Sequence, residues 1–391
     1  MYLSTLDLAL VVVAQHVLIA ISVGFTKPGS MLRALSLPLS VALMLLSESS
    51  SKKDNDMLTL LLVATTPVLV LHHLNIVLLR RWDFVSAGPQ PRDAGKKQVR
   101  LAVPDTVWNR FAFGLSVAIS RRHCGQPFEL DNVPHFRKQD PDFVPSRRRF
   151  LIERGLLYFS TYIVLDYLGS LKPQNDPGSA DTAMEQVAIA VMLWAAAVPY
   201  LTMIFAFPGW VLVLLGLSEP KYWRPVFNFE HGMPYSIRRF WSHYWHLCIK
   251  DMLYQPAKFV ADDMLHLRRG SAIRRYTLIV LSFAVSGLLH MMHDFGFGVP
   301  FQESRSMFFF LSQAFAIMVE DAVAHVWKAL TRGGSRPDAA SNGLAAWQVW
   351  TGRLWVFLVL VYTTSPWAAP RTLHYEGDLA AMPFPIFSRR S

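Results

Sequence analysis

The sequence predicts an all-α integral membrane protein that crosses the bilayer several times. Hydrophobic residues make up 52% of its 391 residues and charged residues only 17%, whereas soluble domains are about one quarter charged. Apolar runs close to the roughly 20 residues that a helix needs to cross a bilayer recur along the chain. Sheets are not expected, because lipid cannot satisfy the open edge of a sheet. Much of the protein surface should therefore face lipid.

The basic residues agree with this interpretation. The formal net charge of +10 would suggest a nucleic-acid partner in a soluble protein. Here the Lys and Arg residues lie between apolar runs, an arrangement typical of the positive-inside orientation of membrane proteins. We therefore expect the lipid bilayer as a partner and no nucleic acid. The two cysteines, Cys124 and Cys248, are too few for a disulfide framework.

Residues 1–79 form the first predicted unit, with membrane spans near 6–25, 31–47 and 57–79. The first apolar run has no basic region before it and no small-x-small site after it. We therefore interpret it as a helix of the mature protein and not as a cleaved signal peptide. Short polar connections join the three spans, and Pro38 predicts a tilt or kink in the second one.

Residues 80–149 form the second predicted unit and contain no span. Fourteen Lys and Arg residues stand against seven Asp and Glu residues there, which favours the cytosolic side. Basic residues flank an apolar stretch near 108–119, and this pattern predicts a short amphipathic helix lying on the membrane.

Residues 150–391 form the third predicted unit, which should contain the catalytic site. The expected spans lie near 150–171, 186–217, 276–294, 306–327 and 347–366. The second of these is too long for one ordinary span and contains Pro199 and Pro208. It is either one long kinked helix or a span followed by a re-entrant piece, so the whole chain should have seven to nine membrane helices.

The run from 276 to 289 is apolar apart from small and hydroxyl residues, and it leads directly into His290. A titratable ring at membrane depth is costly and is functional by default. Ser286 and Gly287 would let a helix or a substrate approach closely, and Asp294 could fix one tautomer of the ring. A neutral imidazole in a dry pocket suits the role of general base. A histidine that only hydrogen-bonds a neighbouring helix is the alternative.

A second polar segment runs from Arg238 to His246 and interleaves basic, aromatic and histidine residues. We expect an amphipathic, membrane-dipping helix that buries its aromatic side chains and places His243 and His246 on one face. An interfacial aromatic belt is one alternative. A zinc site at the His-x-x-His pair is another, but no carboxylate or thiolate stands at ligand spacing.

Three cations beside this segment, Arg238, Arg239 and Lys250, could attract a donor that carries phosphate. Asp262 and Asp263 would suit a magnesium–diphosphate site, but the apolar helices lack the second acidic cluster that such a site needs. We therefore expect no metal and no bound cofactor.

Three motifs follow one another in this part of the chain. A Trp-x-Pro-x-Phe pattern occupies residues 223–227, and a Ser-x-x-x-Phe-Trp-x-x-x-Trp-His box occupies 236–246. A Phe-x-x-Ser-Gly-x-x-His box occupies 283–290. In this order they resemble the wax synthase-like branch of the membrane-bound O-acyltransferase (MBOAT) family, particularly its fungal members. Ser242 stands where the second box of the family usually has glycine.

The resemblance implies an MBOAT-like helical bundle with an internal tunnel in the endoplasmic reticulum membrane. It also implies acyl transfer from acyl-CoA, with acetyl-CoA favoured, to a hydroxyl of a hydrophobic acceptor such as a terpenoid or another secondary metabolite. His290 would be the general base, and His246 would assist from across the tunnel. The expected substrate-binding residues are Trp241, Trp245, His243, Arg238, Arg239, Lys250 and Ser286.

Other functions stay open at this point. One is long-chain wax ester synthesis. Another is a CoA-independent terpenoid cyclase or isomerase on a recruited fold, with Glu320 or Asp321 as proton donor. Release of free CoA distinguishes a transferase from a cyclase. A transporter would spread polar residues over several helices, whereas here they concentrate in two segments.

Overall fold

In the computed structural model the described residues are 3–49, 57–89, 103–170, 182–229, 232–331, 344–374 and 386–387. Regular structure within these ranges is helical, with one isolated bridge between Asp83 and Gly88. The helices are α1 (Thr5–Phe25), α2 (Met31–Ser49), α3 (Met57–His73), α4 (Val107–Ile119), α5 (Arg147–Ser170), α6 (Ala183–Leu214), α7 (Ile237–Arg239), α8 (Lys250–Lys258), α9 (Ala272–Gly296), α10 (Ser306–Thr331) and α11 (Ala346–His374). The prediction of an all-α protein is confirmed.

Three helices continue as π-helical turns. These turns are Leu74–Leu79 after α3, Phe240–Tyr244 after α7 and Phe259–Met264 after α8. Such turns often mark functional sites, because they displace side chains from the regular helical faces. The turn after α7 is the one that determines where His246 lies.

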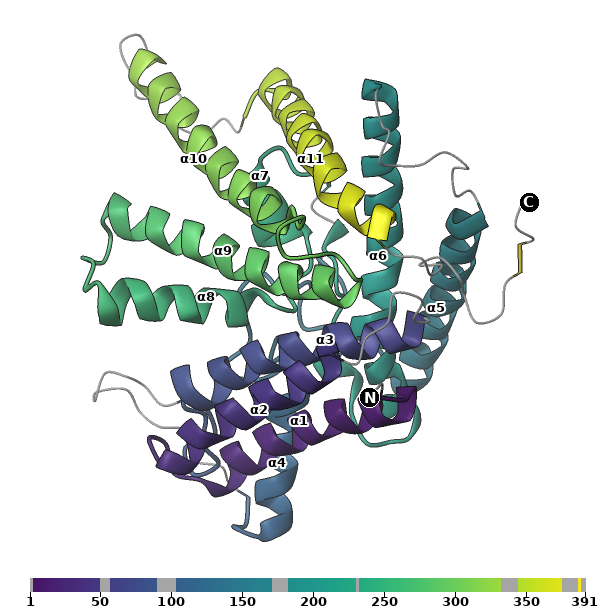
Figure 1. The fold of residues 1–391 in the computed structure, drawn as a ribbon, viewed down its shortest axis with the longest axis vertical. Coiled ribbons are helices and arrows are strands. Elements are labelled where there is room, and N and C mark those ends of the chain that lie inside the picture. The colour runs from purple at the N-terminus through teal and green to yellow at the C-terminus, as the bar shows by residue number, and fades with distance from the viewer. Residues whose placement is uncertain are drawn as a thin grey trace.

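The helices pack in an order that places α9 at the junction of two groups (Figure 1). The N-terminal helices α1–α4, purple to blue in the figure, pack on one another, and α3 packs against α9. On its other sides α9 contacts α8 and α10, and the contacts then continue from α10 to α11, from α11 to α6 and from α6 to α5. The helix that carries His290 is therefore enclosed by segments from both ends of the chain.

Six helices in the described ranges are long and apolar enough to cross a membrane: α1, α2, Leu58–Leu79, α6, α9 and α10. The multi-pass membrane architecture is therefore confirmed. The helices α5 and α11, where the sequence predicts two more spans, contain 24 and 29 residues and fall outside this set. The total of seven to nine spans stays a prediction.

Helix α6 resolves the alternative that its two prolines left open. A single helix of 32 residues runs through both Pro199 and Pro208. Thr182 caps its first turn, and Arg147 donates to the carbonyls of Val213 and Leu214 at its last turn, at 3.1 and 3.0 Å. A cation at this end satisfies carbonyls that have no partner within the helix.

Helix α4 forms where the amphipathic pattern predicts it, and it packs along α1; its place relative to the membrane surface stays a prediction. Arg110 donates to the carbonyl of Gly24 at 3.0 Å, and Gly114 lies against the backbone of Ala20. From Arg110 to Gly114 the contact on α1 moves from Gly24 back to Ala20, so the two helices are antiparallel. The cytosolic location of residues 80–149 and the division into three units stay predictions.

Candidate active site

Helix α9 holds the His290 ring through its own backbone. The Nδ1 atom lies 2.8 Å from the carbonyl oxygen of Ser286, one turn earlier. A carbonyl only accepts, so Nδ1 carries the proton and Nε2 keeps its lone pair. The residue is half-buried. This geometry supplies the unprotonated nitrogen that a general base needs.

The prediction that Asp294 fixes this tautomer is wrong. Asp294 is buried and forms an ion pair with Nε of Arg371 at 2.5 Å. It also accepts from the hydroxyl groups of Ser304 and Ser306, at 2.5 and 2.6 Å. The acid therefore links α9 to α10 and α11 and leaves the imidazole to the Ser286 carbonyl.

Aromatic rings from α10 and α11 surround His290. The ring centroids of Phe310 and Trp367 lie 4.4 and 5.9 Å from that of the imidazole. The indole N–H of Trp367 donates to Ser306 Oγ at 2.8 Å, which fixes the orientation of that ring. A Cβ atom on Gly287 would stand 3.0 Å from the sulfur of Met307, so the expected close approach of another helix to Gly287 is confirmed.

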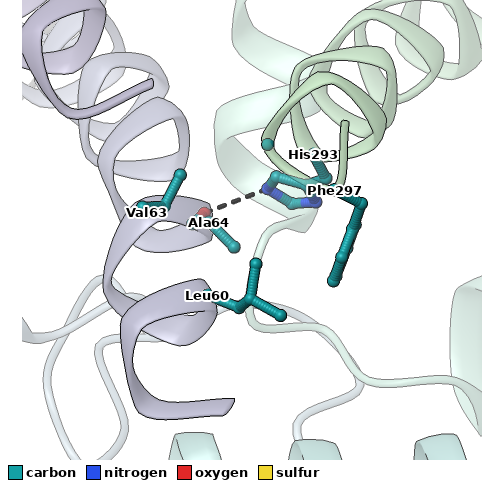
Figure 2. A pocket seen from close by; sticks show the side chains of 6 residues that line it. Leu60, Val63, Ala64, His293 and Phe297 are labelled. Carbon is teal, nitrogen blue, oxygen red and sulfur yellow. Dashed lines mark hydrogen bonds between the residues drawn. The ribbon is translucent and has the colours of Figure 1, made fainter. Parts of the chain in front are cut away.

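His293 lies one turn beyond His290, with 5.3 Å between the ring centroids. Its Nε2 atom donates to the carbonyl oxygen of Ala64 at 3.0 Å, and Figure 2 shows this bond crossing from α9 to α3. Leu60, Val63 and Phe297 line the small pocket beside it. His293 therefore connects two helices, whereas His290 faces the aromatic rings.

The second segment is shorter than the sequence predicts. Helix α7 has three residues, and its π-helical turn ends at Tyr244. Trp245 is extended, with φ −72° and ψ 156°. His243 and His246 therefore do not share a helical face, and the geometry assumed for a His-x-x-His metal pair is absent. The hydroxyl of Ser242 lies 2.6 Å from Nδ1 of His243 and donates to the carbonyl of Arg238 at 2.7 Å.

A cluster of aromatic rings connects this segment to His290. Trp241 lies 6.0 Å from Phe310, which contacts His290, and 6.3 Å from Trp245, which in turn lies 5.3 Å from His246. The indole N–H of Trp241 points to the amide oxygen of Gln313 at 3.4 Å. His246 is also within electrostatic range of His290. The structure thus brings the two predicted segments together, and the tunnel between them stays a prediction.

His246 has a neutral ring in surroundings that are aromatic and basic. Phe205 and Phe227 lie 5.4 and 6.2 Å from the imidazole, and its Nδ1 atom has no hydrogen-bond partner among the described residues. Burial, together with the charges of Arg122 and Arg121, lowers the pKa of His246 to about 3. A neutral imidazole at this position still has one N–H group to offer a substrate.

The three predicted donor-binding cations do not form one cluster. Arg238 pairs with Asp321 at 2.6 Å, and the guanidinium of Arg239 lies 4.8 Å from the Tyr235 ring centroid. Lys250 begins α8, where burial lowers the pKa of its amine and Asp251 lies nearby. Their roles stay predictions.

The buried acids of α10 are already engaged. Glu320 accepts from the backbone N–H groups of Ile237 and Arg238, at 2.5 and 3.2 Å, and from the indole of Trp355 at 3.0 Å. It thereby caps the start of α7, which the sequence alone did not reveal. Asp321 pairs with two arginines. Both acids therefore hold contacts between α10 and the segment that begins at α7.

Comparison with known proteins shows that this chain is similar to acyltransferases. Residues 223–312 match the model of the membrane bound O-acyl transferase family, and they contain both imidazoles. The chain is 28% identical over 378 residues to the acetyltransferase aurG of Calcarisporium arbuscula, covering 88% of this chain and 90% of the relative. It is 26% identical over 340 residues to the acetyltransferase spyB of Aspergillus fumigatus, covering 80% and 56%. It is also 26% identical over 341 residues to the acetyltransferase fsoF of Humicola fuscoatra, covering 75% and 81%. The match over residues 223–312, the acetyltransferase names of the relatives and the multi-pass helices together support an acyltransferase that resembles the membrane bound O-acyl transferase family.

Proposed function

We propose that the protein transfers an acetyl group from acetyl-CoA to a hydroxyl group of a hydrophobic acceptor, such as a terpenoid or another secondary metabolite. The relatives that bear the name acetyltransferase favour the acetyl donor. The observation that carries the proposal is the unprotonated Nε2 of His290, held in an aromatic cluster that leads to His246. Helices of membrane character around this cluster favour an acceptor that dissolves in the bilayer.

In the proposed reaction Nε2 of His290 takes the proton from the acceptor hydroxyl. The alcohol oxygen then bonds to the carbonyl carbon of the thioester, and the carbon–sulfur bond breaks. The thiolate leaves and takes its proton from the imidazolium of His290, which returns to its starting state. The Ser286 carbonyl holds the same tautomer throughout, because it accepts from Nδ1 in both protonation states.

His246 would donate its one N–H group to the oxygen that becomes negative during the attack. A neutral ring suits this role, because the donor is already in place and nothing has to be protonated first. Trp241 and Trp245 would form the walls of the passage between the two imidazoles, and no covalent acyl-enzyme is required when both substrates are held in position.

The test uses membranes from a fungal host that expresses the chain, supplied with radiolabelled acetyl-CoA and a panel of terpenoid and steroid alcohols. We expect a labelled lipid-soluble ester and free CoA in equal amounts. Longer acyl-CoA donors in parallel reactions distinguish an acetyltransferase from a wax synthase. A product formed without CoA release would contradict the proposal.

We also propose that the protein resides in the endoplasmic reticulum membrane, where a multi-pass acyltransferase can meet cytosolic acyl-CoA. Fractionation of the same host should place the chain with markers of that membrane. Recovery with plasma-membrane markers would contradict this location.

A further inference from the structure

Arg121 is a half-buried arginine that forms no ion pair with a carboxylate of the described residues. It follows α4, and its guanidinium carbon lies 5.4 Å from the ring centroid of Phe205. Its electrostatic neighbours are His16 of α1, His72 of α3 and the pair His246 and Cys248. None of these groups carries a permanent negative charge, and the ion pairs among the described residues do not include Arg121.

Several other arginines of the described ranges have hydrogen-bond or ion-pair partners within the protein. Arg122 donates to the backbone carbonyls of Pro225 and Arg224, at 2.5 and 2.7 Å. The arginine–carboxylate pairs are Arg80–Asp251, Arg238–Asp321, Arg274–Asp262 and Arg371–Asp294. An arginine stays protonated even where burial disfavours its charge, and a partly buried charge without a counterion is destabilising. An anion from outside the chain is therefore expected at Arg121.

The position of Arg121 points to the acyl donor as the source of this anion. Phe205 lies 5.4 Å from the His246 ring and 5.4 Å from the guanidinium carbon, so that carbon lies within 10.8 Å of the His246 centroid. The packing of α4 along α1 brings Arg121 to this depth. Helix α3 also connects the surroundings of Arg121 with the His290 end of α9. His72 is an electrostatic neighbour of Arg121, and eight residues separate it from Ala64, whose carbonyl accepts from His293. This corresponds to about 12 Å along the helix axis.

We infer that Arg121 binds a phosphate group of the acyl-CoA donor and thereby positions its thioester between His246 and His290. The inference rests on the proposed function. The phosphopantetheine arm of CoA has a backbone as long as four to five residues and spans roughly 15 Å when extended. The arm is therefore long enough to reach from Arg121 past the His246 ring, whose centroid lies within 10.8 Å of the guanidinium carbon, and the planar guanidinium suits bidentate binding of phosphate.

The test measures ligand binding to the purified full-length protein in detergent. We expect Arg121→Gln to weaken CoA and acetyl-CoA binding about 10- to 100-fold, the range for loss of charge-assisted hydrogen bonds. Pantetheine, which has no phosphate, should bind both proteins equally. The KM for acetyl-CoA should rise while kcat stays close to the wild-type value. The matched control is Arg110→Gln on the same stretch, because Arg110 pairs with the exposed Asp105.

The Tm of Arg121→Gln is a second measurement, and a purely structural role of Arg121 predicts the opposite change in it. Without ligand, Arg121→Gln should unfold at the same temperature as the wild type or higher, because an unpaired charge has been removed. The increase in Tm that CoA produces in the wild type should be lost. A lower Tm without ligand, with CoA affinity unchanged, would overturn the inference and leave the proposed function standing.

Two further outcomes are distinguishable. If the wild type binds neither CoA nor acetyl-CoA, the proposed function fails, and the inference fails with it. If Arg121→Gln binds CoA normally but loses affinity for acidic hydrophobic alcohols, the anion belongs to the acceptor. That outcome would overturn the assignment to the donor.

Discussion

Replacing His290 by alanine tests the proposed chemistry most directly. The variant removes the Nε2 base and the Nδ1–H bond to the Ser286 carbonyl. A positioned general base contributes about 10²- to 10⁴-fold to a rate, which corresponds to about 3–5 kcal/mol of activation free energy. One neutral hydrogen bond contributes only about 1 kcal/mol to folding. We therefore expect kcat to fall by that factor while the protein still inserts and folds.

The assay compares esterification by membranes that contain equal amounts of wild type and variant, with expression measured on immunoblots. The matched control is His293→Gln, because the glutamine amide can donate to the Ala64 carbonyl as the imidazole does. This control should retain most of the activity. Binding of acetyl-CoA to His290→Ala should also be close to the wild-type value, because the proposed base does not hold the donor.

Full turnover by His290→Ala would refute the assignment of the base. Loss of activity in His293→Gln with activity retained in His290→Ala would move the base one turn along α9. A variant that fails to fold is recognised by its Tm, and in that case His290→Gln, which keeps more of the side-chain volume, replaces it.

Three further predictions test the scaffold and its electrostatics. Glu320→Ala should lower the stability by about 1–3 kcal/mol for each donor left unpaired, including the Trp355 indole, and this loss should appear as a lower Tm. An unchanged Tm would contradict the capping role. Gly287→Ala should destabilise the α9–α10 contact by about 1–3 kcal/mol, whereas Gly155→Ala, which meets only open space and one side-chain atom, should be neutral or stabilising. The pKa of His246 is lowered to about 3 in the folded protein. Below about pH 6.5 the unfolded chain therefore binds a proton at this residue, whereas the folded chain does not. Stability should therefore fall as the pH drops, by about 1 kcal/mol at about pH 5.5. His246→Asn should reduce the loss of Tm between about pH 7.5 and 5.5, and an equal loss in both proteins would contradict this.

The membrane helices were predictable because their signal is local. Apolar length alone identifies α1, α9 and α10, and their observed bounds lie within a few residues of the predicted spans. For the same reason the sequence could not decide whether α6 continues as one helix through its two prolines. Whether a helix continues through a proline depends on neighbouring helices that satisfy the freed carbonyls, and the sequence of α6 does not contain them.

The hydrogen-bond partners were not predictable in the same way. Asp294 stands four residues after His290 and was the obvious partner for it, but Arg371, 77 residues further on, takes the acid instead. The π-helical turn after α7 likewise moves His246 off the face that a regular helix would give it. Which donor meets which acceptor depends on helix packing, and that packing is not visible in a local pattern.

The sequence by itself determined that the chain is a helical membrane protein and that it carries two histidines in motifs that resemble those of O-acyltransferases. These properties follow from the length of the apolar runs and the order of the residues in the motifs, both of which can be read directly from the sequence. Only the tertiary structure decided which nitrogen of His290 is free, which acids are engaged, and that Arg121, without an ion pair among the described residues, lies within 10.8 Å of the His246 ring. These depend on contacts between distant segments, because a buried polar group is stabilised or left unpaired only by the groups that folding places beside it.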